Sequence, residues 1–158
     1  MKTLSLFCSI LLSTLSIAQQ SMYDICPIKN SEEIPNATVY KVSGEAIDLK
    51  EYVGKKKAIL VFYRGGWCPY CTRHLWALQE AKEEIETLGY ELIAITPDNF
   101  TKLDSSIKRG KNIGYQLFSD FKINAINAFG VGWKVNDTLF SKYKDQYKLD
   151  LEWWSGSK

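Results

Sequence analysis

The sequence predicts an α/β fold in which a central, mainly parallel sheet is flanked by helices. Residues 58–63 (AILVFY) form a continuous apolar run, which is typical of a strand covered on both faces. Residues 69–88 then carry apolar side chains at steps of three and four, the spacing of an amphipathic helix. Further strand and helix patterns alternate with short connections, which is typical of a parallel sheet.

The first expected elements are an edge hairpin and one helical turn. Residues 37–42 mix β-branched and aromatic side chains and end at a Ser-Gly pair, so they predict an edge strand and a turn. Residues 45–49 are the expected hairpin partner. Residues 49–53 predict a single helical turn that Gly54 ends.

The helix after the buried strand is predicted to begin at Pro69 and to run to about Leu88. The first helical position does not need the N–H that proline lacks, and Gly89 favours termination. The predicted apolar stripe consists of Leu75, Leu78, Ala81, Ile85 and Leu88. Cys71 lies four residues before Leu75, so it belongs to the same stripe.

Residues 91–96 and 115–119 are the next two expected strands. Between them a helix is predicted, with one face formed by Phe100, Leu103 and Ile107. After the second strand, Asp120 is placed to cap a helix that ends at Gly130. Its expected inward residues are Ile123, Ile126 and Phe129. One more amphipathic helix is predicted over residues 137–147.

The N-terminal residues 1–18 are expected to be a secretory signal peptide. Lys2 supplies a positive charge, residues 4–17 are largely apolar, and small residues favour cleavage after Ala18. The stretch is too short to span a bilayer core of about 30 Å comfortably. The mature protein is therefore expected to be periplasmic or secreted, with no membrane attachment after cleavage.

Residues 19–158 are expected to form one domain. The net charge of +2 is too small to indicate a nucleic-acid or membrane surface. Three cysteines follow the signal peptide, too few for a disulfide-stapled scaffold. Two of them form one tight pair, Cys68 and Cys71, which indicates redox chemistry or metal binding.

The pair lies where the buried strand passes into the helix. At the helix N-terminus, free N–H groups and the positive end of the helix dipole favour a thiolate at Cys68. Cys71 lies one turn further on, close enough for the two sulfurs to form a disulfide. Arg64 adds positive potential, and the Gly65-Gly66 pair lets the backbone approach a substrate closely.

Three other interpretations of the pair are weaker. A zinc or iron–sulfur site needs more ligands, and only Cys26 and the single histidine, His74, remain. Covalent haem attachment needs a histidine where Thr72 stands. A structural disulfide would close a loop too small to stabilise the fold much. A redox-active pair without metal, haem or flavin is therefore expected.

Residues 61–71 (VFYRGGWCPYC), followed by Leu75, Leu78 and Gln79, resemble the peroxiredoxin-like branch of the alkyl hydroperoxide reductase and thiol-specific antioxidant family. Residues 94–98, 116–120 and 128–130 extend the resemblance more weakly, so that it covers residues 38–130. It implies a thioredoxin-like fold and an antioxidant enzyme that reduces hydrogen peroxide or alkyl hydroperoxides. A thioredoxin-like protein or another dithiol is then the implied reductant.

The resemblance leaves the order of the two cysteines open. Family members carry a threonine three residues before the attacking cysteine, a register that makes Cys71 the nucleophile and puts Cys68 in place of the threonine. Thioredoxins use the first cysteine of the pair, which is Cys68. The helix argument also favours Cys68 as the exposed, activated thiol. Arg64, Trp67 and Pro69 are the expected substrate-positioning residues.

A proline-containing loop that faces the cysteines, then two strands and a helix, is also implied by the thioredoxin-like fold. The four prolines are Pro27, Pro35, Pro69 and Pro97, and none follows Gly130. The C-terminal strands are therefore expected to be missing, as in a truncated chain, together with an arginine that the family sets beside the peroxide.

Two further functions remain as alternatives. The first is a periplasmic thiol–disulfide oxidoreductase that acts on protein disulfides, because export and a CPxC pair suit that compartment. The second is a thioredoxin-like binding module without catalysis.

Trp67, next to the cysteine pair, is expected either to shield the sulfurs, to contact a partner or to pack within its loop.

Overall fold

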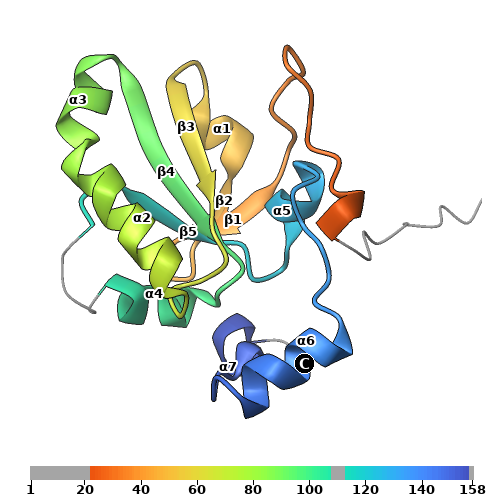
Figure 1. Ribbon diagram of the computed structural model, residues 1–158. Helices are drawn as coiled ribbons and strands as arrows, with labels where there is room; N and C mark the ends of the chain where they lie inside the picture. The colour runs from red at the N-terminus through yellow and green to blue at the C-terminus, as the bar shows by residue number, and fades with distance from the viewer. Residues whose placement is uncertain (1–21, 108–112, 157–158) are drawn as a thin grey trace, which may run out of the picture.

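One mixed sheet lies at the centre of the protein, which we describe from a computed structural model covering residues 22–107 and 113–156. Five strands of these residues are joined in the order β2-β1-β5-β4-β3. Strands β3, β4 and β5 are parallel, whereas β1 is antiparallel to both of its neighbours. The strands are β1 (Thr38–Tyr40), β2 (Ala46–Asp48), β3 (Lys57–Phe62), β4 (Tyr90–Thr96) and β5 (Gln116–Ser119). The predicted α/β fold is confirmed, and the N-terminal hairpin makes the sheet mixed (Figure 1).

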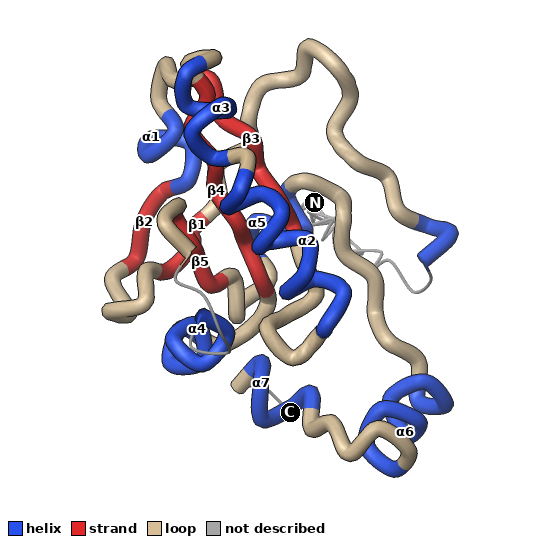
Figure 2. Tube along the Cα trace, turned by 60° about the vertical axis from the view of Figure 1, so that its left-hand side comes forward, coloured by secondary structure: helices blue, strands red, loops and turns tan. Residues whose placement is uncertain are grey.

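Helices flank this sheet, and two more lie beyond one end of it (Figures 1 and 2). They are α1 (Leu49–Val53), α2 (Pro69–Glu80), α3 (Lys82–Thr87), α4 (Phe100–Ile107), α5 (Asn124–Ala128), α6 (Asp137–Asp145) and α7 (Leu151–Ser155), after a short 3-10 turn over Met22–Asp24. The single turn α1 agrees with the predicted bounds. Its Asp48 caps it by accepting a hydrogen bond from Glu51 N at 2.9 Å.

Alternate residues of the central strands enter two separate apolar layers. On one face, Ile93, Ile95 and Phe118 pack with residues of α1 and α5. On the other face, Leu92, Ala94 and Leu117 pack with Leu75 of α2 and with Tyr115. Both faces of the sheet are therefore covered, as the apolar run of residues 58–63 predicts.

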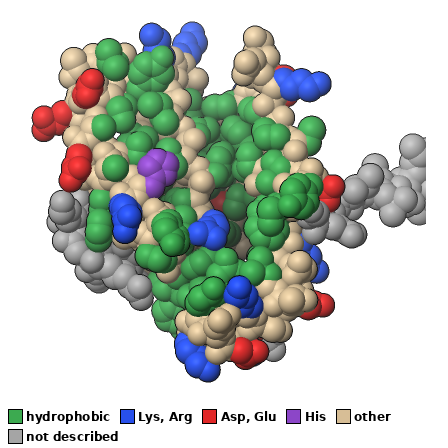
Figure 3. All heavy atoms as spheres, viewed as in Figure 1, with side chains coloured by type: hydrophobic (Ala, Val, Ile, Leu, Met, Phe, Trp, Pro, Cys, Tyr) green, Lys and Arg blue, Asp and Glu red, His purple; other side chains and the backbone are tan. Residues whose placement is uncertain are grey.

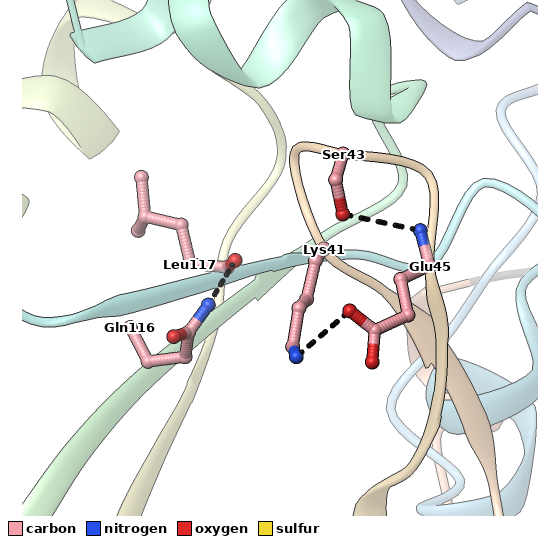
Figure 4. Close-up of polar contacts among 5 residues, drawn as sticks. All are labelled: Lys41, Ser43, Glu45, Gln116 and Leu117. Atoms are coloured by element: carbon pink, nitrogen blue, oxygen red, sulfur yellow. Dashed lines mark hydrogen bonds and ion pairs between the residues drawn. The ribbon is translucent and has the colours of Figure 1, made fainter.

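The predicted hairpin is present (Figure 4). The prediction that its first strand lies at the sheet edge is wrong, because β1 pairs with both β2 and β5 and leaves β2 as the edge strand. Lys41 Nζ forms an ion pair with Glu45 Oε2 at 2.9 Å, and Glu45 N donates to Ser43 Oγ at 3.4 Å. Gly44 has a φ of 85°, which suits the tight turn between β1 and β2. In the neighbouring strand, Gln116 Nε2 donates to the Leu117 carbonyl at 2.9 Å. The hairpin closes one edge of the sheet, on the side opposite β3.

The helix predicted over residues 69–88 is divided in two. It begins at Pro69 as predicted, but α2 and α3 are separated at Ala81. Leu88, predicted to lie on the apolar stripe, is 65% exposed. It lies past the end of α3, where Gly89 turns the chain with a φ of 82°, and so it is outside the apolar layer.

The helix after β5 starts later than predicted. Residues 120–123 form a turn in which Ile123 N donates to the Asp120 carbonyl at 2.7 Å, and α5 begins only at Asn124. Ile123 takes a left-handed conformation in this turn and is 47% exposed, so the prediction that it faces inward is wrong. Asp120 still accepts a backbone hydrogen bond, from Ile126 N at 2.7 Å.

The C-terminal part of the described chain is helical. Helix α6 is shorter than predicted, and α7 was not expected from the sequence pattern. In α7, Trp154 is buried whereas Trp153 is half exposed. The Trp154 carbonyl accepts a hydrogen bond from Asn99 N at 2.8 Å, which ties α7 to the loop after β4.

The predicted signal peptide, residues 1–18, lies outside the described residues. Within residues 22–107 and 113–156, every helix is too short or too polar to cross a membrane.

Candidate active site

The two cysteines lie at the junction of β3 and α2. Cys68 is the N-cap residue of α2, with φ −86° and ψ 112°, and Pro69 takes the first helical position. The strand ends at Phe62, so residues 63–67 form the link to the helix. This link brings the free N–H groups of the helix N-terminus to the sulfur of Cys68.

A buried carboxylate holds the link in place. Asp98, two residues after the end of β4, is 1% exposed, and its Oδ2 accepts a hydrogen bond from Gly66 N at 2.7 Å. Burial raises the pKa of Asp98 to about 7, although the hydrogen bond from Gly66 opposes the shift. Gly65 has a φ of 149°, and a Cβ there would collide with the Trp67 indole and lie 2.7 Å from Asp98 Oδ1. The link therefore needs glycine at this point.

Charge and hydrogen bonds converge on the sulfur of Cys68. Arg64 Nη2 donates to Cys68 Sγ at 2.9 Å, and Cys71 N donates to the same sulfur at 3.4 Å. Burial raises the pKa of Cys68, but hydrogen bonds from the Cys71 side chain and backbone and the charge of Arg64 outweigh it. The net effect is a pKa below the ordinary value, so the thiolate is favoured at Cys68.

The second cysteine has the opposite character. Burial and the hydrogen bond to Cys68 raise the pKa of Cys71, so Cys71 gives up its proton less readily than Cys68. Both residues are free thiols. Cys68 is fully buried and Cys71 only partly, so the prediction that Cys68 is the exposed thiol is wrong. The helix-end position does supply hydrogen bonds, but it also turns the sulfur into the first turn, where Arg64 contacts it.

An aromatic residue that sequence reasoning missed also belongs to the site. Tyr143, in α6, accepts a hydrogen bond from Arg64 Nη1 at 3.3 Å. The ring of Trp67 lies 5.5 Å from Arg64 Cζ, and it meets the Tyr143 ring edge-on at a centroid distance of 5.5 Å. Tyr143 lies within the helix predicted over residues 137–147, and no local pattern in the sequence links it to Arg64.

An open hollow of about 680 Å³ adjoins this group. It is lined by Trp67, Tyr147, Lys148, Leu149, Asp150, Trp153 and Trp154. On the face seen in Figure 3, hydrophobic side chains gather between α2 and the α6–α7 pair. The pair of cysteines therefore lies next to a largely aromatic surface.

The other side chains singled out in the sequence stay apart from this group. His74 is exposed on α2, and Cys26 is exposed near the start of the described chain. Within residues 22–107 and 113–156, histidine, cysteine and acidic side chains form no group of three that could hold a metal ion.

The fold and the site together define a class of protein. A Cys-x-x-Cys pair at the N-terminus of the helix after a buried parallel strand is the arrangement of thioredoxin-fold thiol oxidoreductases. Comparison with known proteins narrows the class. Residues 31–146 match the AhpC/TSA family, so the chain belongs to that family and is a peroxiredoxin-like oxidoreductase.

Two relatives and one solved structure illustrate the match. The chain is 29% identical over 125 residues to the putative peroxiredoxin bcp of Haemophilus influenzae, covering 79% of each chain. It is 25% identical over 121 residues to the thiol-disulfide oxidoreductase ResA of Halalkalibacterium halodurans, covering 75% of this chain and 66% of the relative. Reduced Prx3 from Vibrio vulnificus has a similar fold, with a TM-score of 0.64 and 16% identity over 70% of this chain and 72% of that one.

Proposed function

We propose that the protein is a thiol peroxidase that reduces hydrogen peroxide or alkyl hydroperoxides through Cys68 and Cys71. The observation that carries the proposal is the 2.9 Å contact between Arg64 Nη2 and Cys68 Sγ at the start of α2. A guanidinium and helix N–H groups favour the thiolate, which is the nucleophilic form of cysteine. Peroxide reduction is also the activity that the name of the Haemophilus influenzae relative indicates.

The proposed cycle has three steps. The Cys68 thiolate attacks one peroxide oxygen, the O–O bond breaks, and water or an alcohol leaves with a proton while the sulfur becomes a sulfenic acid. The Cys71 thiol then attacks that sulfur, which forms the Cys68–Cys71 disulfide and releases water. A thioredoxin-like protein or another dithiol supplies two electrons, becomes oxidised to its disulfide and restores both thiols. Arg64, Trp67 and Pro69 are proposed to position the reacting groups.

The main question for experiment is which of the two cysteines attacks the peroxide. The charge of Arg64 favours the thiolate at Cys68, and we propose Cys68 as the attacking residue. Because its side chain is buried, peroxide reaches its sulfur only after a neighbouring side chain moves. Cys71 is already partly accessible, but its raised pKa leaves less of it as thiolate at neutral pH.

The test compares the purified protein with its Cys68→Ser and Cys71→Ser variants. Each reduced protein receives one equivalent of hydrogen peroxide, and peroxide loss and sulfenic acid are followed by stopped flow and mass spectrometry. We expect loss far faster than with a free thiol, and sulfenic acid trapped in Cys71→Ser alone. Sulfenic acid only in Cys68→Ser would make Cys71 the attacking residue. Loss no faster than the free-thiol control would end the peroxidase proposal.

A second candidate function is thiol–disulfide exchange with other proteins. It is favoured by the partly accessible Cys71 beside the exposed Tyr70, and by the name of the relative ResA. Reduction of a protein disulfide at a rate above that of the free-thiol control, with no peroxide turnover, would establish it. Loss of this exchange in Cys68→Ser would show that the pair is responsible.

Export is a separate proposal. It rests on the N-terminal sequence, with Lys2, the apolar residues 4–17 and the small residues before a cleavage point after Ala18. Expression of the whole chain in a Gram-negative host, followed by cell fractionation and N-terminal mass analysis, tests it. We expect a periplasmic protein that begins at Gln19, whereas an uncleaved chain in the cytoplasm would contradict the proposal.

A further inference from the structure

Arg64 makes the contact on which the proposed chemistry depends, yet its side chain is exposed. A free arginine side chain samples many rotamers, and fixing it in one costs conformational entropy. Its hydrogen bond to Cys68 Sγ is made through one nitrogen, Nη2, and the group also interacts with the neighbouring Cys71 side chain. A second contact, away from the sulfurs, is needed to hold the plane of the group.

Tyr143 supplies that second contact through a different nitrogen. Its hydroxyl accepts a hydrogen bond from Arg64 Nη1 at 3.3 Å, while Nη2 donates to the sulfur. The guanidinium thus bridges the Tyr143 hydroxyl and Cys68 Sγ. Trp67 adds a ring contact at 5.5 Å from Arg64 Cζ and meets the Tyr143 ring edge-on. Two nitrogens with separate partners define the orientation of a planar group.

The helix that carries Tyr143 is held by contacts of its own. Asn136 caps α6, with its Oδ1 accepting a hydrogen bond from Leu139 N at 2.8 Å. Helix α6 packs against α7, and the Trp154 carbonyl of α7 is bound by Asn99 N at 2.8 Å. Figures 1 and 2 both show α6 and α7 together beyond the end of the sheet. Tyr143 therefore reaches Arg64, 79 residues away, from an anchored element.

We propose that Tyr143 is a positioning residue that holds the Arg64 guanidinium against the sulfur of Cys68. Without the Tyr143 hydroxyl, Arg64 is still present, but its guanidinium is no longer held in contact with the Cys68 sulfur. The thiolate then spends less time in contact with the positive charge. The inference rests on the proposed function, because it concerns the activation of the same cysteine.

The test measures the pKa of Cys68 directly. All proteins carry Cys71→Ser, so that Cys68 titrates without a coupled thiol. The pKa is read from the carbon-13 NMR shift of the labelled Cys68 Cβ, which needs no access for a reagent. Four proteins are compared on this background: the unaltered one, Tyr143→Phe, Arg64→Gln and the double variant.

Tyr147→Phe is the matched control. Its ring lies 6.0 Å from that of Tyr143, and it follows the same helix, but within the described residues its hydroxyl has no hydrogen bond. A thermal unfolding curve for each variant shows whether it is folded. In Tyr143→Phe, phenylalanine keeps the ring that packs on Trp67, so this substitution removes the hydroxyl alone.

We expect Tyr143→Phe to raise the pKa of Cys68 by about half a unit to one unit, as loss of one hydrogen bond implies. Arg64→Gln should raise it further, and Tyr143→Phe should add nothing once Arg64 is absent. Tyr147→Phe should leave the pKa unchanged. An unchanged pKa in Tyr143→Phe, or an equal shift with and without Arg64, would overturn the proposal.

The outcome is independent of the peroxidase assay. If the pKa values follow the expected pattern but the protein reduces no peroxide, the positioning role of Tyr143 is supported and the proposed peroxidase function is contradicted. If the protein reduces peroxide but Tyr143→Phe leaves the pKa of Cys68 unchanged, the peroxidase function is supported and the positioning role is contradicted.

Discussion

Replacement of Asp98 by asparagine should change how stability depends on pH. The carboxyl group is buried beneath the link to α2, and burial raises its pKa to about 7 from an ordinary value of 3.8. Asparagine has nearly the same shape, and its amide oxygen can still accept the hydrogen bond from Gly66 N. The substitution therefore removes the titration and keeps the contact.

The direction in which the free energy of unfolding changes with pH follows from proton binding to Asp98. Between about pH 4 and pH 7 the folded protein keeps the proton on Asp98 while the unfolded chain releases it, so the free energy of unfolding falls as pH rises. One pKa unit corresponds to about 1.4 kcal/mol, so the loss across this window approaches about 4 kcal/mol. Asp98→Asn should not show this loss. Asp120, whose pKa burial raises to about 6, adds a slope of the same sign in both proteins.

Urea denaturation of both proteins under reducing conditions, at several pH values from about 4.5 to 7.5, provides the measurement. The difference in unfolding free energy should move in favour of Asp98→Asn as pH rises, by about 2–4 kcal/mol over the range. The absolute stability of the variant does not matter, since only the pH slope is compared. Parallel pH profiles for the two proteins would refute the view that Asp98 is protonated in the fold.

Three more predictions concern the same region and the core. Arg64→Gln should raise the pKa of Cys68 by about one to two units, because a charge-assisted hydrogen bond is lost; the carbon-13 NMR titration of the Cys68 Cβ in the Cys71→Ser background measures it. Gly65→Ala should destabilise the protein by about 2–4 kcal/mol, since its Cβ would collide with the Trp67 indole and with Asp98 Oδ1, and thermal unfolding checks this. Phe118→Ala should cost about 3–5 kcal/mol in urea denaturation, because the ring is fully buried; a loss below about 1 kcal/mol would contradict the core assignment.

The parts of the fold that depend on neighbours in sequence were predictable. The apolar run of residues 58–63 marks a buried strand, and Pro69 marks the start of a helix, because both signals lie within a few residues of the element. The single turn over Leu49–Val53 has its cap at Asp48 and its stop at Gly54. In each case local geometry decides the outcome.

Contacts between distant segments were not predictable in the same way. Asp98 reaches Gly66 across 32 residues, and Tyr143 reaches Arg64 across 79. Neither contact leaves a periodic pattern in the sequence. The helix argument gave the direction of the Cys68 pKa but not its burial, since burial depends on how the link and Arg64 pack around the sulfur.

The unequal exposure of the two sulfurs has a consequence for how electrons enter. With both thiols free, Cys71 is the more exposed of the two residues, so an incoming thiolate should reach its sulfur first in the disulfide that the proposed cycle requires. Displacement then releases Cys68, and a thiol with a lower pKa leaves faster. The mixed disulfide with the reductant should therefore form at Cys71. The buried sulfur of Cys68 would then reduce the peroxide, and the more exposed sulfur of Cys71 would receive the electrons from the reductant.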